Sequence, residues 1–347
     1  MDLKQAMMDL SLARGPSGRE WVREESSVTA VARALLDEFT DRSWVDAHGS
    51  LIGVRENPGR PKLLLDAHLD EVSMTVTGQA EGFLRFSPLG IDPRILPATA
   101  VKVLAPEGEL EGVITCLPPH VLSAEERKKP FKKDDLYIDC GLTEAEAETL
   151  TGCPVVYAAK PFLLGENRVC GKSLDDRACY LVLLRALELL KDEKLDVELY
   201  VVGSGQEENG GTGAATACYG IDPDFALVTD VTFGDTPDSP KDATYPMGGG
   251  PTISQGPILN RRLTALLKDC AKAEDVEYAL EIASRGTGTN ADDVQSAREG
   301  VPTVLVSIPL QYMHEPLEVI DLRDVEAAAK LIAAFVRRVG KEAAECV

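Results

Sequence analysis

Residues 195–220 have the sequence LDVELYVVGSGQEENGGTGAATACYG, in which an apolar run leads through an acidic, glycine-rich loop into a run of small residues. The first part, LDVELYVVG, is typical of a buried strand, and GTGAATACYG is typical of a helix. The adjacent glutamates Glu207 and Glu208 therefore follow directly on a strand. They are either a solvated acidic turn or two carboxylates that a reaction requires.

Helical and strand patterns alternate on both sides of this stretch. Helices are expected over residues 17–38, 173–191, 211–220, 260–274, 290–300 and 322–340. Strands are expected over 61–71, 195–203, 224–231, 276–284 and 302–310, with a hairpin-edge strand over 43–54. Such alternation indicates a sheet with parallel strands. The continuous apolar run from Leu63 to Leu65 suits a strand that is covered on both faces.

Residues 73–165 follow a different pattern. Short β-like pieces are separated by glycine, proline and charge clusters, with one helix expected over 142–150. This pattern indicates a small β-rich domain. We therefore expect an α/β fold with a mixed, largely parallel sheet flanked by helices, formed by residues 1–72 and 166–347. Residues 73–165 are expected to form an inserted, β-barrel-like domain.

The composition excludes several classes of protein. The 347 residues include 36 basic and 57 acidic ones, a formal charge of −21, which argues against nucleic acid or an anionic membrane as a partner. No apolar run reaches the roughly 20 residues that span a bilayer, and the N-terminus lacks the apolar core of a secretory signal. The eight cysteines are never closer than nine positions, which excludes CxxC motifs. We expect a cytoplasmic protein.

Titratable residues gather where the predicted strands end. Sites in open α/β sheets form at the carboxyl ends of the strands. The residues expected at that edge are His68, Asp70, Glu71, Asp175, Asp176, Glu207, Glu208, Asp230 and His314. Two of the four histidines belong to this set. Imidazole and carboxylate groups together are ligands of zinc, cobalt and manganese.

Each of these residues also has a simpler explanation. Asp175 and Asp176 can cap the helix that follows them, and Asp230 can be a turn residue. It is the coincidence of five strand or helix ends on one edge that favours a site. His68 and Asp70 are two positions apart and therefore point to the same side of an extended strand. A carboxylate in that position can orient a metal-bound histidine.

The sequence resembles the tetrahedral-type metallo-aminopeptidases, the glutamyl and leucyl aminopeptidases of the M42 family, over nearly the whole chain. The order and spacing of several motifs carry this resemblance. These motifs are GPSGRE (15–20), AHLDEV (67–72), DPRILP (92–97), GVITCLPPHVLSAEERKK (112–129), DDLYIDCG (134–141), GKSLDDR (171–177), GQEENGGTGA (205–214), TDVTFGDTPD (229–238) and MHEPLEVID (313–321).

The resemblance implies two divalent metal ions per subunit, zinc or cobalt. It implies that His68 and Asp230 are the terminal ligands of one ion, and that Glu208 and His314 are those of the other. Asp175 matches the carboxylate that bridges both ions. The division of ligands between the two ions comes from the resemblance alone.

The resemblance also implies the reaction. Glu207 matches the general base, and Asp70 matches the acid that orients the histidine. Two metals can hold a bridging water, lower its pKa and polarise a carbonyl, while Glu207 takes the proton and passes it to the leaving amine. The implied enzyme is an aminopeptidase that hydrolyses N-terminal residues from short peptides. In the family, the inserted domain assembles large homo-oligomers, often dodecamers.

Two positions depart from the family pattern. Glu315 follows His314 where serine is usual, and Asn290 stands where aspartate is common. Neither position belongs to the implied ligand set. We expect both loops to line the substrate pocket, so that these changes affect specificity rather than catalysis.

Two other functions use some of the same residues. Paired carboxylates also cleave glycosidic bonds, but that mechanism needs neither metal nor histidine, and sugar sites usually bring aromatic residues, which are only 5% here. A non-catalytic, metal-binding assembly on the same fold is the other alternative. Loss of the base would be its sign, and Glu207 is present.

Overall fold

The computed structural model describes residues 1–20 and 26–346. The chain is divided into two structural units. The first consists of Met1–Glu71, Pro161–Met313 and Glu318–Val347. The second consists of Val72–Lys160 and His314–Leu317.

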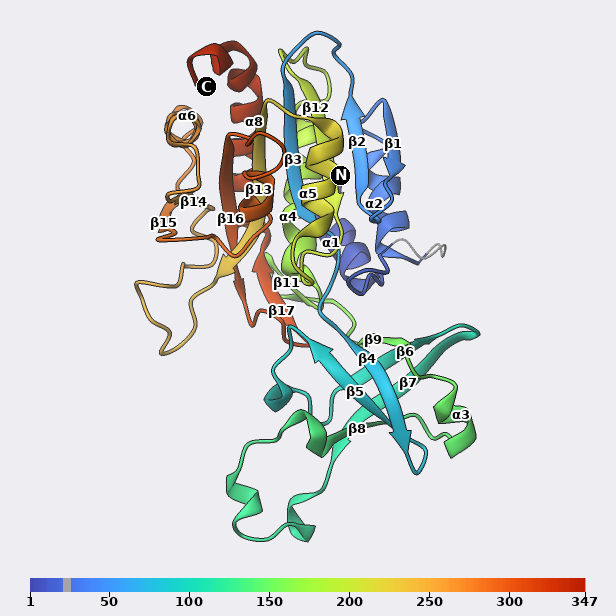
Figure 1. The fold of residues 1–347 in the computed structure, drawn as a ribbon. Helices are drawn as coiled ribbons and strands as arrows, with labels where there is room; N and C mark the ends of the chain where they lie inside the picture. Colours follow the sequence, from blue (N-terminus) through green and yellow to red (C-terminus); the bar gives the residue numbers. More distant parts are fainter. Residues whose placement is uncertain (21–25, 347) are drawn as a thin grey trace. The chain divides into compact units, whose positions relative to one another are not determined.

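The first unit contains a mixed sheet with the strand order β1-β2-β12-β3-β13-β16-β17-β11-β10 (Figure 1). Its central strands β12, β3, β13 and β16 are parallel, whereas the pairs toward both margins are antiparallel. Strand β14 pairs with β15 and with β16. The bounds are β1 Arg42–Val45, β2 Leu51–Arg55, β3 Lys62–His68, β10 Phe162–Leu164, β11 Arg168–Gly171, β12 Glu198–Ser204, β13 Phe225–Phe233, β14 Thr252–Gln255, β15 Ala279–Ile282, β16 Thr303–Gln311 and β17 Glu318–Asp321.

Helices cover both faces of this sheet, as the core residues show. One apolar cluster joins the sheet to α1 (Leu3–Leu12), α2 (Val28–Leu36), α4 (Leu174–Leu189), α6 (Arg261–Ala273) and α8 (Leu322–Cys346). The other cluster joins it to α5 (Thr212–Ile221) and α7 (Ala291–Val294). In β3, Leu63 and Leu65 pack into the first cluster and Leu64 into the second. The predicted mixed α/β fold, with its buried central strand, is thus confirmed.

Several elements are shorter than their patterns predict. The helix expected over 17–38 begins only at Val28, where the hydroxyl of Ser27 accepts the N–H of Ala30 and so caps the first turn. Residues 17–20 are not helical, and residues 21–25 lie outside the described chain. The helix expected over 290–300 is the short α7, and the strand expected over 43–54 is the hairpin of β1 and β2.

The second unit is a closed antiparallel barrel with the strand order β4-β5-β8-β7-β6-β9. Closure leaves no free edge between these strands. Its interior is apolar, with side chains such as Met74, Leu84, Val103 and Ile138 fully buried. The elements are β4 Ser73–Ala80, β5 Phe83–Leu89, β6 Ala100–Ala105, β7 Gly108–Cys116, β8 Leu136–Asp139, β9 Pro154–Tyr157, α3 Glu144–Glu148, and the 3₁₀ turns Pro93–Ile95, Pro119–Val121, Glu126–Lys128 and Lys133–Asp135. The expected small barrel is confirmed.

Within the described part of the chain, no helix combines the length and the apolar character that crossing a membrane requires.

Candidate metal centre

Four segments of the first unit bring titratable side chains to one edge of the sheet, and one of them is the loop after β12, with Glu207 and Glu208. His68 is the last residue of β3 and lies in register with Ser204, the last residue of the parallel strand β12. Asp230 lies toward the carboxyl end of β13, the other neighbour of β3. Asp175 and Asp176 lie at the start of α4. Parallel strands end at a common edge, and for this reason residues far apart in sequence meet here.

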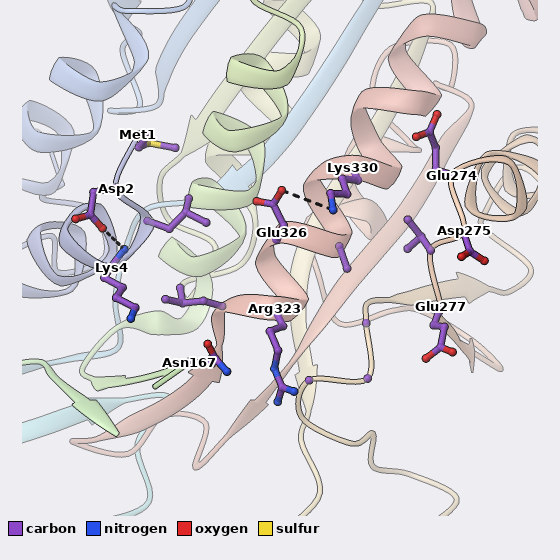
Figure 2. A pocket seen from close by; sticks show the side chains of 17 residues that line it. Met1, Asp2, Lys4, Asn167, Glu274, Asp275, Glu277, Arg323, Glu326 and Lys330 are labelled. Carbon is purple, nitrogen blue, oxygen red and sulfur yellow. Dashed lines mark hydrogen bonds and ion pairs between the residues drawn. The ribbon is translucent and has the colours of Figure 1, made fainter. Parts of the chain in front are cut away.

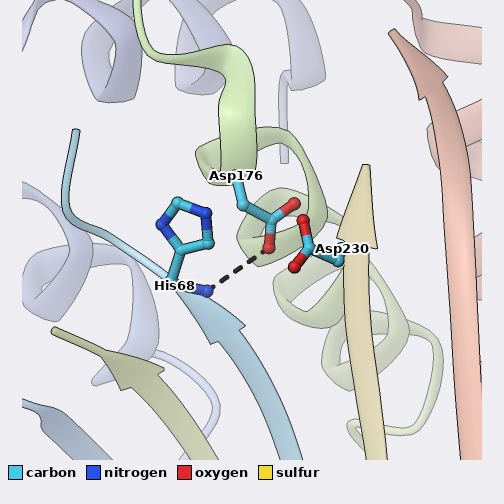
Figure 3. Close-up of side chains that lie close together, drawn as sticks. All are labelled: His68, Asp176 and Asp230. Atoms are coloured by element: carbon cyan, nitrogen blue, oxygen red, sulfur yellow. Dashed lines mark hydrogen bonds between the residues drawn. The ribbon is translucent and has the colours of Figure 1, made fainter. Parts of the chain in front are cut away.

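The structure places these side chains in two overlapping groups that could each hold a metal ion. One group is His68, Asp176 and Asp230, and the other is His68, Asp175 and Glu208. Within each group the ligand atoms lie within 4.8 Å of one another. Figure 3 shows the carboxylates of Asp176 and Asp230 facing each other beside the His68 ring. Glu208 is half-buried, and the other four residues are buried.

The imidazole of His68 lies between two carboxylates. Its Nε2 atom lies 3.1 Å from Oδ1 of Asp175, and its Nδ1 atom lies 3.4 Å from Oδ1 of Asp70. The backbone N–H of His68 donates to Oδ2 of Asp176 over 3.3 Å. Burial favours the neutral ring, but Asp175 and Asp70 outweigh it and raise the pKa of His68 well above its usual value. The site therefore already attracts positive charge.

The carboxylates of the cluster show the same excess of negative charge. Burial is the main cause that raises the pKa of Glu207 to about 7, and the nearby carboxylates Glu208 and Asp175 add to it. Burial also raises the pKa of Asp176 and of Asp230 well above the usual value. Acids that are buried close together cannot all be charged at low cost unless a cation joins them.

The donor set fits a divalent cation. Imidazole nitrogen and carboxylate oxygen are the ligands of zinc, cobalt and manganese in proteins. The Oδ1 atom of Asp176 is buried and has no hydrogen-bond partner among the described residues. Such an atom is costly to bury without a partner, and a bound cation would satisfy it.

Asp70 contacts both His68 and the loop after β12. Besides its approach to Nδ1 of His68, its carboxylate accepts the backbone N–H of Glu207 over 3.0 Å and that of Glu208 over 3.1 Å. Asp70 is completely buried. One carboxylate thus connects the end of β3 with the two adjacent glutamates, a contact that the sequence spacing did not predict.

His314 belongs to the second unit. There its Nδ1 atom lies 2.8 Å from the carbonyl oxygen of Gly90, and its own carbonyl accepts the hydroxyl of Tyr157 over 3.3 Å. Its role as a metal ligand stays a prediction. Glu315 also belongs to the second unit and is partly buried.

Glu71 lies in a separate cluster and not among the candidate metal ligands. Its carboxylate receives Lys172 Nζ over 2.5 Å, the hydroxyl of Ser173 over 2.6 Å and the guanidinium of Arg177 over 3.1 Å. All four residues are buried. Burial alone would raise the pKa of Glu71, but Lys172 and Arg177 outweigh it and lower that pKa to about 2. This acid is neutralised by the chain itself.

Glu318 is a buried acid at the site to which the sequence analysis assigned no role. It is the first residue of β17, and its Oε2 atom accepts the N–H groups of Leu174 over 2.7 Å and of Asp175 over 3.1 Å. It therefore caps the start of α4, which carries the two aspartates. The sequence did hold one sign that Glu318 belongs to the site, since this residue lies inside the motif at 313–321.

The side chain of Asn290 is buried. That its loop lines the substrate pocket stays a prediction. The Nδ2 atom of Asn290 donates to Oδ2 of Asp66 and to the hydroxyl of Ser204, both over 2.9 Å. Asp66 lies in β3 and Ser204 in β12. An amide suits this position, since it can donate to a buried carboxylate, whereas a second ionised carboxylate would repel it.

A cavity of about 690 Å³ lies elsewhere in the first unit (Figure 2). It is lined by residues of both signs from the chain start, the Gly248–Gly250 turn, residues 274–277 and the first turns of α8. Its lining includes acidic side chains such as Glu274 and Glu277 and basic ones such as Arg323 and Lys330, and Figure 2 shows Lys330 directed to Glu326. None of the candidate metal ligands is among its lining residues, so this cavity is separate from the metal centre.

Comparison with known proteins shows to which family this chain is similar. The sequence pattern of the M42 glutamyl aminopeptidase family matches residues 49–331. The lysyl aminopeptidase of Pyrococcus furiosus is 32% identical over 309 residues, which cover 87% of this chain and 88% of that protein.

Two solved structures are similar over nearly the whole chain. A TET aminopeptidase from the marine archaeon Thaumarchaeota archaeon SCGC AB-539-E09 has a TM-score of 0.91 and 32% identity, covering 99% of this chain and 98% of that one. The TET1 peptidase of Pyrococcus horikoshii, which can assemble into a tetrahedron or a large octahedral shell, has a TM-score of 0.82 and 29% identity, covering 97% and 100%. With its family pattern, its fold and its cluster of possible metal ligands, the chain belongs to the M42 glutamyl aminopeptidases, a family of peptide hydrolases.

Proposed function

We propose that this protein is an aminopeptidase that uses two divalent metal ions to release N-terminal residues from short peptides. The observation that carries this proposal is the pair of overlapping imidazole and carboxylate groups at one sheet edge, with the ligand atoms of each group within 4.8 Å of one another. The raised pKa values of its acids mark a site short of positive charge. Strongly perturbed acids in one cluster are typical of catalytic sites.

We assign the metal ligands as the family resemblance implies. His68 and Asp230 would hold one ion, Glu208 and His314 the other, and Asp175 would bind both. Zinc and cobalt suit these donors. When bound, the two ions would make a water molecule more acidic and would draw electron density from the scissile carbonyl.

Asp176 is a further candidate ligand. It lies in one group with His68 and Asp230, and its Oδ1 atom is buried without a hydrogen-bond partner among the described residues. The structure therefore offers both aspartates of the GKSLDDR motif to the site. Comparing the metal content of Asp175→Asn and Asp176→Asn protein will decide which of them binds.

Glu207 is the proposed general base. Its backbone is held by Asp70, and its half-buried side chain belongs to the group of interacting acids. A base works best when its pKa lies near the operating pH, and burial raises the pKa of Glu207 to about 7. Glu207 would take a proton from the attacking water and deliver it to the leaving amine. Glu208 would bind metal, so the adjacent glutamates have different roles.

We further propose that the protein forms a homo-oligomer, with the second unit as its assembly domain. The similar TET1 peptidase of P. horikoshii assembles into a tetrahedron or an octahedral shell, and a dodecamer is the state that the resemblance favours. Light scattering on the purified protein measures this directly. A mass of one or two subunits at micromolar concentration would contradict it.

The test of the function is the cleavage of aminoacyl anilides before and after metal removal. We expect Leu-, Glu- or Lys-anilide to be hydrolysed, activity to vanish with chelator, and Zn²⁺ or Co²⁺ to restore it. The absence of hydrolysis with every metal and every N-terminal residue would refute the proposal. Cleavage of a β-glucan that survives chelation would instead support the glycosidase alternative, and bound metal without cleavage of either substrate would support a non-catalytic assembly.

A further inference from the structure

Three successive backbone N–H groups after β12 all donate to buried carboxylates. The N–H of Gln206 donates to Oε1 of Glu20 over 2.9 Å. The next two, those of Glu207 and Glu208, donate to the two oxygens of Asp70 over 3.0 and 3.1 Å. Two acids from separate parts of the chain therefore hold the backbone that carries the adjacent glutamates.

The backbone conformation of this loop suits carboxylate binding. Gln206 has a φ of 61°, in the left-handed region, and turns of this kind leave successive backbone N–H groups available to bind anions. Here the first N–H binds Glu20 and the next two bind Asp70. Gly205 allows Glu20 to come close, because a Cβ atom at this position would lie only 3.1 Å from its carboxylate. The loop and Glu20 thus fit each other closely.

Glu20 is itself held in place. Its Oε1 atom also accepts the N–H of Gly18 over 2.8 Å, and its backbone carbonyl accepts the hydroxyl of Thr29 over 2.8 Å. The residue is fully buried. Its second oxygen, Oε2, has no hydrogen-bond partner among the described residues. Burying a carboxylate with an unsatisfied oxygen costs free energy. One of the contacts of Glu20 is with the loop that carries Glu207.

We propose that Glu20 is a positioning residue of the aminopeptidase reaction. By accepting the N–H of Gln206, it sets the backbone from which Glu207 and Glu208 project, while Asp70 holds the next two N–H groups. Glu20 need not touch the substrate or the metals to act in this way. This inference rests on the proposed function, in which Glu207 is the base and Glu208 is a ligand.

The test compares Glu20→Ala and Glu20→Gln, measured with Co²⁺-loaded protein. Glutamine keeps an oxygen that can accept both N–H groups, whereas alanine removes it. The matched controls are Asp324→Ala and Asp324→Asn. Asp324 is also a buried acid that accepts two backbone N–H groups, those of Gly248 and Gly250, over 2.7 and 2.8 Å, and this turn lies outside the candidate metal centre.

We expect Glu20→Ala to lower kcat by about 100-fold, the loss that a shift of about 1 Å in a catalytic group can cause, and to change KM by less than about threefold. It should also weaken Co²⁺ binding in competition with a chelator and alter the visible absorption of bound Co²⁺. Glu20→Gln should restore most of kcat. Asp324→Ala should lower the melting temperature to a similar extent and leave kcat and the Co²⁺ spectrum unchanged.

Three results would overturn the inference. They are wild-type kcat and Co²⁺ spectrum in Glu20→Ala, equal losses of kcat in Glu20→Ala and Asp324→Ala, and a Glu20→Gln protein as impaired as Glu20→Ala. If Glu20→Ala does not fold, Glu20→Asp replaces it, because the shorter side chain draws the carboxylate away from the N–H of Gln206. We then expect a lowered kcat and an altered Co²⁺ spectrum in Glu20→Asp, with Glu20→Gln and Asp324→Asn near wild type, and wild-type behaviour of Glu20→Asp would overturn the inference. If wild-type protein cleaves no peptide, the proposed function fails, and the Co²⁺ affinity and spectrum still test the positioning role.

Discussion

Two buried clusters of charge are interleaved at one edge of the sheet, and they differ in how their acids are neutralised. His68 and Glu71 are three residues apart, yet they belong to different clusters. Glu71 meets Lys172 and Arg177, and its pKa falls to about 2. Asp176 and Asp230 share one imidazole, and burial raises the pKa of each.

The difference shows how a buried ion cluster that only stabilises the fold can be distinguished from a metal-binding site. Burial disfavours charge in both clusters, so burial alone identifies neither of them. What separates them is the supply of cations from the chain: the Glu71 cluster contains Lys172 and Arg177, whereas in the described part of the chain the metal cluster has the imidazole of His68 among several acids. The second cluster is therefore the one that would gain from a cation supplied by the solution.

The largest expected effect concerns the catalytic part of the metal cluster. We expect Glu207→Gln to lower kcat by roughly 10²- to 10⁴-fold, the usual contribution of a general base, while the protein keeps its metal. Steady-state kinetics and elemental analysis of metal content measure both. Glu208→Gln is the control, because it should lose metal as well as activity. A Glu207→Gln protein within about threefold of wild type would show that another group is the base.

The second largest effect is expected from removing the acid of the Glu71 cluster. Glu71→Ala leaves Lys172 and Arg177 buried without their carboxylate, and the loss of one partner from a buried pair costs about 3–5 kcal/mol. Denaturant unfolding measures the change in the free energy of unfolding. The exposed Glu38→Ala serves as control and should stay within about 0.5 kcal/mol of wild type. A loss below about 1 kcal/mol in Glu71→Ala would mean that the cluster contributes little to stability.

The same cluster should make stability depend on pH. The pKa of Glu71 is about 2 in the folded protein and 4.5 ordinarily, so the unfolded chain binds more protons between these values. The stabilisation is complete above pH 4.5 and is lost as the pH falls toward 2, which amounts to about 3 kcal/mol. Denaturant unfolding of wild type and Glu71→Gln at several pH values measures this contribution of Glu71 to the free energy of unfolding. Parallel curves for the two proteins would contradict it.

The smallest expected effect has the opposite sign. Asp230→Asn removes a buried carboxyl group whose charged form is disfavoured by burial and by the neighbouring acids, and asparagine can still accept the N–H of Val231 that Asp230 accepts over 2.7 Å. We expect the metal-free variant to melt a few degrees above metal-free wild type, which is about 1 kcal/mol, and to bind metal more weakly. The exposed Asp242→Asn should change neither property. A lower melting temperature for metal-free Asp230→Asn would show that this acid stabilises the metal-free protein, as Glu71 does, and would contradict the contrast between the two clusters.

Much of the fold could be predicted because its signals are local. The apolar runs of β3 and β12 mark buried strands, and the residues after them mark the edge where the site forms. Helix ends were harder to predict, since the start of α2 depends on one cap at Ser27 rather than on periodicity. The inward turn of the Asn290 side chain to Asp66 could not be predicted, because a loop position does not reveal the direction of a side chain.

The sequence by itself determined the α/β architecture, the inserted barrel and the set of acids and histidines from which a site could be built. The hydrophobic period and the order of helices and strands along the chain suffice for these, because both depend on neighbours in the chain. Only the tertiary structure decided which acids meet cations and which meet other acids. Glu71 and Arg177 are 106 positions apart, and Glu20 and Gln206 are 186 positions apart. The free energy of a buried charge depends on distances of a few ångströms in space, and folding alone sets those distances.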